Sequence, residues 1–215
     1  MDRPDLVIFD NDGVLVDSER LANGILADLL TEAGLPYTLE QAVHDFMGGT
    51  MARVRASAEP RLGHPLPDDF EDRYHARLFD GFARLQPVPG VPEVLDALDR
   101  AGTPYCVASS GTHERIQNAL TSVGLYQRFE GRVFSTQDVE HGKPAPDLFL
   151  HAAGSTGTDP ERCVVVEDSP PGVEAARAAG MYVIGFAAMT PAERLAAADV
   201  VVDEMGALPG LLGLS

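Results

Sequence analysis

Short runs of consecutive apolar residues recur along the chain and predict the strands of a buried sheet. The first run covers residues 6–9, and the second covers residues 105–108. Neither run alternates with polar residues, which is typical of strands that are covered on both faces. Further apolar runs that fit short strands lie at residues 133–134, 163–166, 182–186 and 200–202.

Amphipathic helical patterns separate several of these predicted strands. Residues 91–100, 113–123 and 173–179 have this pattern, and each segment is followed within two residues by a glycine that can end a helix. Strands that alternate with helices favour a parallel sheet with helices on both faces. The predicted fold class is therefore α/β, with a doubly wound, Rossmann-like parallel sheet.

Between the first two strands the pattern changes to successive helices with no strand among them. Thr38 and Gln41, three residues apart, form a capping-box pattern at the start of one helix. The four helices are expected at residues 19–33, 38–47, 51–59 and 68–85. We therefore predict a discontinuous core of residues 1–16 and 87–215, with an inserted α-helical bundle, the cap, at residues 17–86.

Charge and composition narrow the range of partners. The chain has 215 residues and a formal net charge of −17, with 45% hydrophobic and 23% charged residues. Such an acidic protein has little to neutralise the phosphates of nucleic acids or of anionic membranes, so neither is an expected partner. An anionic substrate would need a local positive charge. We expect a monomer, with a homodimer as the alternative.

The two cysteines and the N-terminus bear on the compartment. Cys106 and Cys163 lie in or beside apolar runs, so we expect buried free thiols rather than a disulfide or a redox pair. No apolar run approaches the roughly 20 residues of a membrane span. The N-terminus, which has acidic residues around one arginine, is not typical of a signal peptide. These features predict a cytoplasmic location.

Polar side chains gather where the predicted strands end. In open parallel sheets, ligands bind outside the carboxyl ends of the strands, so residues that follow different strands meet at one edge. The residues expected there are Asp10, Asp12, Ser109, Ser110, Lys143, Glu167 and Asp168. Four carboxylates beside one lysine cannot all stay ionised unless a cation joins them. Oxygen ligands without a histidine or cysteine cluster point to Mg²⁺, and such a site suits a phosphoryl group.

Four sequence segments then match one family in order and spacing. The segments are FDNDGVLVDSE, VASSG, HGKPAPD and VVVEDS. Together they resemble the four motifs of the haloacid dehalogenase superfamily of phosphatases and phosphomutases. The inserted bundle is similar to the small helical cap of the branch that contains phosphoglycolate phosphatase and beta-phosphoglucomutase. The resemblance covers essentially the whole chain.

The resemblance implies a Mg²⁺-dependent phosphatase that hydrolyses a small phosphate monoester through an aspartyl-phosphate. Its expected partner is therefore a small phosphorylated metabolite. Asp10 would be the nucleophile, and Asp12 would protonate the leaving oxygen and later deprotonate water. Ser109 and Lys143 would bind the phosphoryl group, assisted by the turn at Ser110. Alternatively, Ser109 only caps the next helix, and a lone lysine is more often a solvated surface residue.

The resemblance also implies a set of metal ligands. Asp10, the backbone carbonyl of Asp12 and the carboxylate of Asp168 would bind Mg²⁺. Glu167 would be a further ligand, would act through water, or would have only a structural role.

A phosphosugar mutase is the alternative within the family. Beta-phosphoglucomutase and many sugar phosphatases have a histidine where this chain has Ala22, and the mutase has a lysine where this chain has Met47. A mutase must also hold a second phosphate with cations in the cap, for which Arg53 and Arg55 are the nearby candidates. These departures favour water as the phosphoryl acceptor.

Two further alternatives come from other classes of protein. A true dehalogenase would attack carbon without a metal, which the additional acidic residues argue against. A phospho-aspartate receiver module also gathers acids, a hydroxyl and a lysine around Mg²⁺, but it lacks an inserted cap. The cap is expected to select the substrate, which can be a sugar phosphate, phosphoglycolate or phosphogluconate. Candidate contacts in the cap are Met47, Gly49, Thr50 and Arg53.

Overall fold

The computed structural model describes residues 3–46, 50–82 and 85–214, which form two compact units. One unit comprises Met1–Asp17 and Gln86–Ser215, and the other is the intervening segment Ser18–Leu85. Each boundary of the inserted unit lies one residue inside the range 17–86 expected for the cap. The two units are described separately below.

The larger unit is built on one parallel sheet of six strands in the order β3-β2-β1-β4-β5-β6. The strands are β1 (Leu6–Phe9), β2 (Tyr105–Ser109), β3 (Val133–Ser135), β4 (Cys163–Glu167), β5 (Tyr182–Phe186) and β6 (Val200–Val202). The first strand lies in the interior, where Phe9 is in register with Val107 of β2 and Val166 of β4. The predicted α/β class with a parallel sheet is confirmed.

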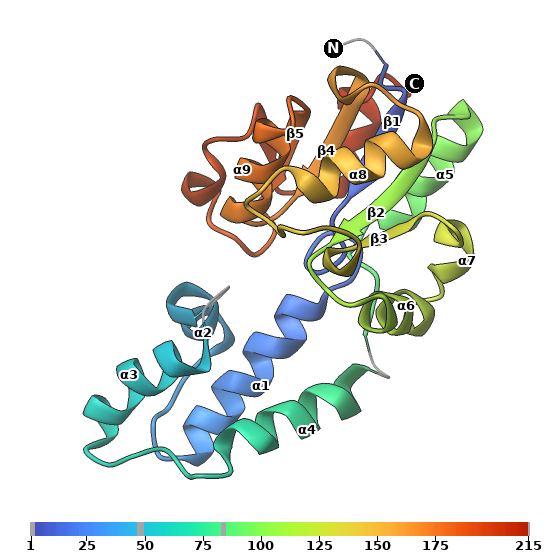
Figure 1. The fold of residues 1–215 in the computed structure, drawn as a ribbon. Coiled ribbons are helices and arrows are strands. Elements are labelled where there is room, and N and C mark those ends of the chain that lie inside the picture. Colours follow the sequence, from blue (N-terminus) through green and yellow to red (C-terminus); the bar gives the residue numbers. More distant parts are fainter. Residues whose placement is uncertain (1–2, 47–49, 83–84, 215) are drawn as a thin grey trace. The chain divides into compact units, whose positions relative to one another are not determined.

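Helices cover both faces of this sheet (Figure 1). On one face, α8 (Asp147–Thr156) and α9 (Pro170–Ala178) pack over a core that includes Ile8, Phe149 and Val165. Figure 1 shows α5 (Val91–Ala101) on the other side of the strands. Because both faces are covered, all four residues of β1 are buried, as its unbroken apolar run predicts.

Further helical elements complete this unit. They are α6 (His113–Ser122), α7 (Tyr126–Phe129), α10 (Leu208–Leu211), η1 (Thr136–Asp138), η2 (Pro160–Arg162), η3 (Ala192–Leu195) and η4 (Met205–Ala207). Cys106 and Cys163 are buried free thiols, as expected. Burial raises the pKa of Cys163 to about 11, so its thiol is protonated at neutral pH.

The smaller unit consists of four helices with an apolar core of its own. The helices are α1 (Ser18–Glu32), α2 (Leu39–Phe46), α3 (Met51–Leu62) and α4 (Phe70–Phe82). Leu30 and Phe70 are fully buried in this core. The capping box that precedes α2 is present, because the Thr38 N–H donates to Gln41 Oε1 (2.9 Å) and the Gln41 N–H donates to Thr38 Oγ1 (3.3 Å). Within the described ranges, no helix combines the length and the apolar character that crossing a membrane requires.

Candidate active site

Asp10 stands directly after β1, at the carboxyl end of a strand inside the sheet. Its backbone N–H continues the ladder by donating to Val166 O (3.0 Å), so the residue is fixed to the neighbouring strand. Gly13 then turns the chain with φ of 80°, a left-handed conformation that favours glycine. The Asp10 side chain is only 10% exposed. A carboxylate is therefore held rigidly where parallel sheets bind ligands.

Lys143 joins this carboxylate to a second one. Its Nζ lies 2.6 Å from Asp10 Oδ1, 2.7 Å from Glu167 Oε1 and 3.0 Å from Ala108 O. The lysine side chain is 4% exposed and that of Glu167 is 1% exposed. All three ammonium donors are thus engaged, and residues from separate parts of the sequence meet at one buried point.

The charges in this group shift one another's pKa. Burial raises the pKa of Asp10 to about 7; Lys143 opposes the shift, whereas the Glu167 and Asp12 carboxylates add to it. Burial alone would lower the pKa of Lys143, but Asp10 and Glu167 together raise it above its usual value. Lys143 is therefore a permanent cation in a site with an excess of carboxylates.

Glu167 is supported from the start of α9. Its Oε2 accepts hydrogen bonds from Ser169 N (2.8 Å) and Ser169 Oγ (2.9 Å), while its Oε1 faces Lys143. Gly172 makes room for this carboxylate, because a Cβ at that position would lie 1.8 Å from Oε1. Both oxygens are engaged by the protein, which favours a supporting role for Glu167 toward Lys143. Its role as a metal ligand stays a prediction.

The two serines after β2 differ in their surroundings. Ser109 is buried, and its Oγ accepts a hydrogen bond from Gly111 N (3.2 Å). Ser135 Oγ in turn donates to Gly111 O (2.6 Å), which fixes this turn against the end of β3. Ser110 is exposed, and among the described residues no recorded contact joins it to the buried charges. Their roles in substrate binding stay predictions.

Asp12 has a cationic neighbour that the sequence motifs did not reveal. Arg115 Nη2 lies 3.3 Å from Asp12 Oδ1, and the two side chains are 52% and 19% exposed, respectively. Lys143 is the one cation that the four sequence segments were expected to bring to this edge, and Arg115 comes from outside them. A signal was present: Arg115 lies in the first turn of α6, where a cation opposes the helix dipole and needs an acidic partner.

The donor atoms at this edge suit a hard metal ion in type and in charge. The carboxylates of Asp10, Asp12, Glu167 and Asp168 outnumber the cations Lys143 and Arg115, and Asp168 is buried like Asp10. Carboxylate oxygens are the donors that Mg²⁺ prefers. Across the described parts of the chain, however, no three histidine, cysteine or acidic side chains are gathered closely enough to hold a metal ion. The residues fit Mg²⁺ as donors, and Asp10, Glu167 and Asp168 are the buried carboxylates among them.

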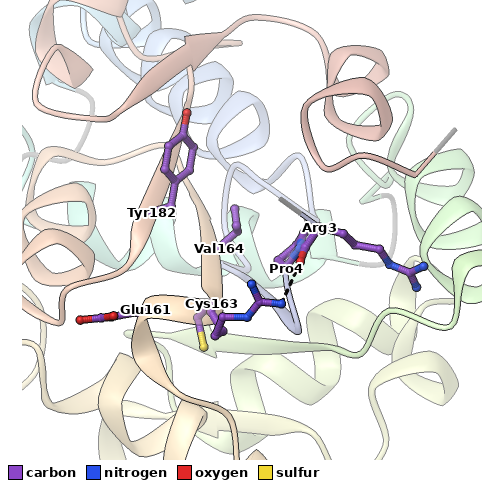
Figure 2. A pocket seen from close by; sticks show the side chains of 7 residues that line it. Arg3, Pro4, Glu161, Cys163, Val164 and Tyr182 are labelled. Atoms are coloured by element: carbon purple, nitrogen blue, oxygen red, sulfur yellow. Dashed lines mark hydrogen bonds between the residues drawn. The ribbon is translucent and has the colours of Figure 1, made fainter. Parts of the chain in front are cut away.

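Two cavities of about 220 and 340 Å³ lie at the opposite, amino ends of the strands. Arg3 and Arg162 line both, and Figure 2 shows the smaller one with Cys163 and Tyr182 in its wall. These arginines already have partners: Arg162 forms an ion pair with Asp5 (2.9 Å), and Arg3 Nε donates to Thr103 Oγ1 (2.9 Å). Neither cavity belongs to the group around Asp10.

The cap residues expected to contact substrate are described only in part. Met47 and Gly49 lie outside the described residues. Thr50 caps α3, since its side chain accepts a hydrogen bond from Arg53 N (3.3 Å), and the Arg53 side chain is exposed. The substrate contacts predicted for these residues stay predictions.

Comparisons with known proteins agree with this architecture. A family model described as "Haloacid dehalogenase-like hydrolase" matches residues 7–186. Among curated relatives, the 6-phosphogluconate phosphatase of Escherichia coli (strain K12) is 30% identical over 192 residues, which cover 87% of this chain and 85% of that protein.

Solved structures show the same fold. A conserved haloacid dehalogenase-like protein from Agrobacterium tumefaciens str. C58 is 40% identical, with a TM-score of 0.87 and 97% coverage of both chains. A HAD family hydrolase from Deinococcus radiodurans R1, with bound phosphate and sodium, is 32% identical, with a TM-score of 0.89 over 99% of this chain and 98% of that one.

The solved structures that are similar to this chain also include the branch of the family that contains beta-phosphoglucomutase. A putative beta-phosphoglucomutase from Thermotoga maritima is 28% identical, with a TM-score of 0.78 over 99% of each chain. Since the family match spans most of the sequence and the relatives align over nearly their whole length, this chain belongs to the haloacid dehalogenase-like hydrolases.

Proposed function

We propose that this protein is a Mg²⁺-dependent phosphatase that hydrolyses a small phosphate monoester through an aspartyl-phosphate. One observation carries the proposal. The buried carboxylate of Asp10 at the carboxyl end of a central strand lies 2.6 Å from the ammonium group of Lys143. A rigid nucleophile beside a fixed positive charge is the arrangement that attack on an anionic phosphoryl group needs, because the repulsion between two anions must be offset.

The first step transfers the phosphoryl group to the protein. An Asp10 carboxylate oxygen attacks phosphorus, the bond between phosphorus and the ester oxygen breaks, and Asp12 gives a proton to the leaving oxygen. Lys143 and Ser109 bind the phosphoryl oxygens during transfer. Lys143 gives up one of its present contacts for this purpose, because its three donors are all engaged.

The second step releases inorganic phosphate. Asp12, now ionised, takes a proton from a water molecule, and the water oxygen attacks phosphorus. The bond between Asp10 and phosphorus breaks, which restores the Asp10 carboxylate. Asp12 thus ends the cycle protonated for the next leaving group.

Mg²⁺ would be held by Asp10, Asp168 and the backbone carbonyl of Asp12, with Glu167 supporting Lys143. When bound, the ion neutralises charge on the phosphoryl oxygens and on the crowded carboxylates. The raised pKa of Asp10 supports this cofactor, since burial and neighbouring carboxylates disfavour its ionised form in the protein alone.

The substrate class we propose is a sugar phosphate or a small acid such as phosphoglycolate. The related E. coli protein is named a 6-phosphogluconate phosphatase, which supports this class. A mutase activity is the second candidate, because a putative beta-phosphoglucomutase shares the fold. Of the two cap arginines named as candidates for the second phosphate, Arg55 contacts Glu59 (3.4 Å) and Arg53 is exposed. Interconversion of sugar 1- and 6-phosphates by the purified protein would establish the mutase instead.

Phosphate release from a panel of small phosphate esters, with Mg²⁺ and with EDTA, tests the proposal. We expect turnover with Mg²⁺ only, and a fall of about 10³-fold or more in the Asp10→Asn protein because the nucleophile is lost. Peptide mass spectrometry of a quenched reaction should find phosphate on the peptide that contains Asp10. Turnover by Asp10→Asn, or full activity in EDTA, would contradict the proposed mechanism.

A further inference from the structure

Arg115 occupies a fixed position beside the residues proposed to carry the reaction. It is the third residue of α6, and its backbone N–H donates to the side chain of the N-cap residue Thr112 (3.2 Å). Its side chain runs back over Gly111, where a Cβ atom, if present, would lie 3.7 Å from Arg115 Cδ and 3.6 Å from Ser109 Oγ. The arginine stem therefore crosses the turn that follows β2, next to the buried serine.

The contact that Arg115 makes is one that a ligand can replace. Its guanidinium lies 3.3 Å from Asp12 Oδ1, with about half of the side chain exposed. An ion pair with such an exposed partner is weak, since solvent screens it and the long side chain loses freedom. A cation in the first turn of a helix also gains from any anion that approaches it. Asp12 thus positions the guanidinium, but a ligand anion can replace this contact.

The donor capacity of the two cations differs. Lys143 uses all three ammonium donors on Asp10, Glu167 and Ala108. Arg115 has five donors in a planar fork, and Asp12 is the one side chain recorded against its guanidinium within the described residues. That fork matches the two oxygens of a carboxylate or of a phosphate. Of these two cations, Arg115 is the one with donors available for a further anion.

The position of Arg115 indicates which part of the substrate it would contact. The transferring phosphoryl group is proposed to bind Ser109 and Lys143, whereas Asp12 serves the leaving oxygen. A guanidinium that contacts Asp12 lies on the leaving-group side, where the organic part of the substrate begins. We propose that Arg115 is a specificity-determining residue that binds a second anionic group, a carboxylate or a second phosphate, on the organic part of the substrate. This inference rests on the proposed phosphatase function.

Pairs of substrates that differ by one anionic group test the inference. Phosphoglycolate is compared with 2-hydroxyethyl phosphate, and 6-phosphogluconate with sorbitol 6-phosphate; fructose 1,6-bisphosphate and fructose 1-phosphate supply the pair for a second phosphate. We expect the wild-type protein to favour the anionic member of at least one pair by about 10-fold or more in kcat/KM. The pair that shows the preference tells whether the second group is a carboxylate or a phosphate. It also tells how far that group lies from the phosphoryl group that is transferred.

Substitution of Arg115 should remove this preference. In Arg115→Met, the ratio of kcat/KM between the two members should fall by about 10-fold or more, mainly through a higher KM for the anionic member. Arg115→Lys should retain part of the preference, because it keeps the charge but loses the fork. Arg177→Met is the matched control, since Arg177 is 51% exposed and pairs with Asp199 at 3.2 Å away from the site. It should leave every ratio unchanged.

Three results would overturn the inference. Equal losses for both members of every pair in Arg115→Met would mean that Arg115 acts only through Asp12 or the phosphoryl group. An unchanged ratio of kcat/KM in Arg115→Met would mean that Arg115 does not contact the second anionic group. A wild-type protein that turns over both members of each pair equally well would lead to the same conclusion. By contrast, a wild-type protein that releases no phosphate from any ester overturns the proposed function itself, and this inference with it.

Discussion

Asp10 combines burial with a charge that its surroundings only partly stabilise. Lys143 favours the ionised carboxylate, but desolvation and the neighbouring acids outweigh it, so the pKa of Asp10 rises to about 7. The site thus disfavours the ionised form of Asp10 compared with an exposed aspartate, and a further cation would favour it. Burying this carboxylate lowers the stability of the fold, and such groups are typical of functional sites.

The Asp10→Asn protein should show this in its stability. The carboxyl group has an ordinary pKa of 3.8 and a raised pKa of about 7 in the folded chain, so the folded wild type binds more protons between these values and loses stability as pH rises through them. Asparagine does not titrate. In EDTA, the Tm of Asp10→Asn minus that of wild type should therefore increase from pH 4.5 to pH 7.5. A difference that is flat or decreases with pH would contradict the raised pKa.

Asn11, between Asp10 and Asp12, is the subject of a second prediction about stability. Its side chain is fully buried, and its Oδ1 and Nδ2 have no hydrogen-bond partner among the described residues. An unsatisfied buried amide is costly, so Asn11→Leu, which is similar in size, should raise the free energy of unfolding by about 1–2 kcal/mol. Urea denaturation measures this change.

Asn23 supplies the control for that substitution. It is also buried, but its Nδ2 donates to Glu19 O (2.8 Å). Asn23→Leu should therefore lower the free energy of unfolding by about 1 kcal/mol. Equal effects of the two substitutions would show that hydrogen-bond satisfaction does not explain them.

At the scale of elements, the N-terminus of α9 and the end of β4 depend on each other through Gly172. Ala is the better helix former by about 1 kcal/mol, yet Gly172→Ala would place a Cβ atom 1.8 Å from Glu167 Oε1. We expect a loss of about 1–3 kcal/mol in the free energy of unfolding and lower phosphatase activity, because the displaced carboxylate no longer supports Lys143.

Gly154 in α8 is the matched position for this test. A Cβ there would have no atom within 4 Å, so Gly154→Ala should be neutral or stabilising by up to about 1 kcal/mol with unchanged activity. If Gly172→Ala were equally stabilising and fully active, the close contact with Glu167 would not limit this position.

The predicted elements differ in how well their signals stand out. β5 and β6 lie at the residues expected, because each is a short run of apolar residues, interrupted only by Gly185, that does not have a helical period. The helix α8 was not predicted, since its start lies directly after Pro144 and Pro146. Its Phe149 ring lies 4.9 Å from Lys143 Nζ, so the unpredicted helix helps to enclose the site. Sequence patterns therefore predict a helix or strand best where tertiary contacts do not determine the residues at which it begins and ends.

At the scale of the whole molecule, the excess of carboxylates at one edge of the sheet should make stability depend on a divalent cation. Adding Mg²⁺ to EDTA-treated protein should raise Tm by about 2–5 °C, because a ligand of the folded state alone stabilises it. Asp168→Asn should reduce this rise, whereas KCl at equal ionic strength should not reproduce it. A thermal-shift series measures all three. No response of the wild type to Mg²⁺ would count against the proposed cofactor.

The sequence by itself determined the parallel α/β fold, the inserted helices and the stretches that carry the chemistry. It could do so because apolar runs and short motifs are local, and because parallel strands bring their carboxyl ends to one edge. It did not determine how the charges pair. Only the tertiary structure decided that Lys143 joins Asp10 to Glu167, and that Arg115 reaches Asp12, since these contacts connect residues more than 20 positions apart and depend on packing.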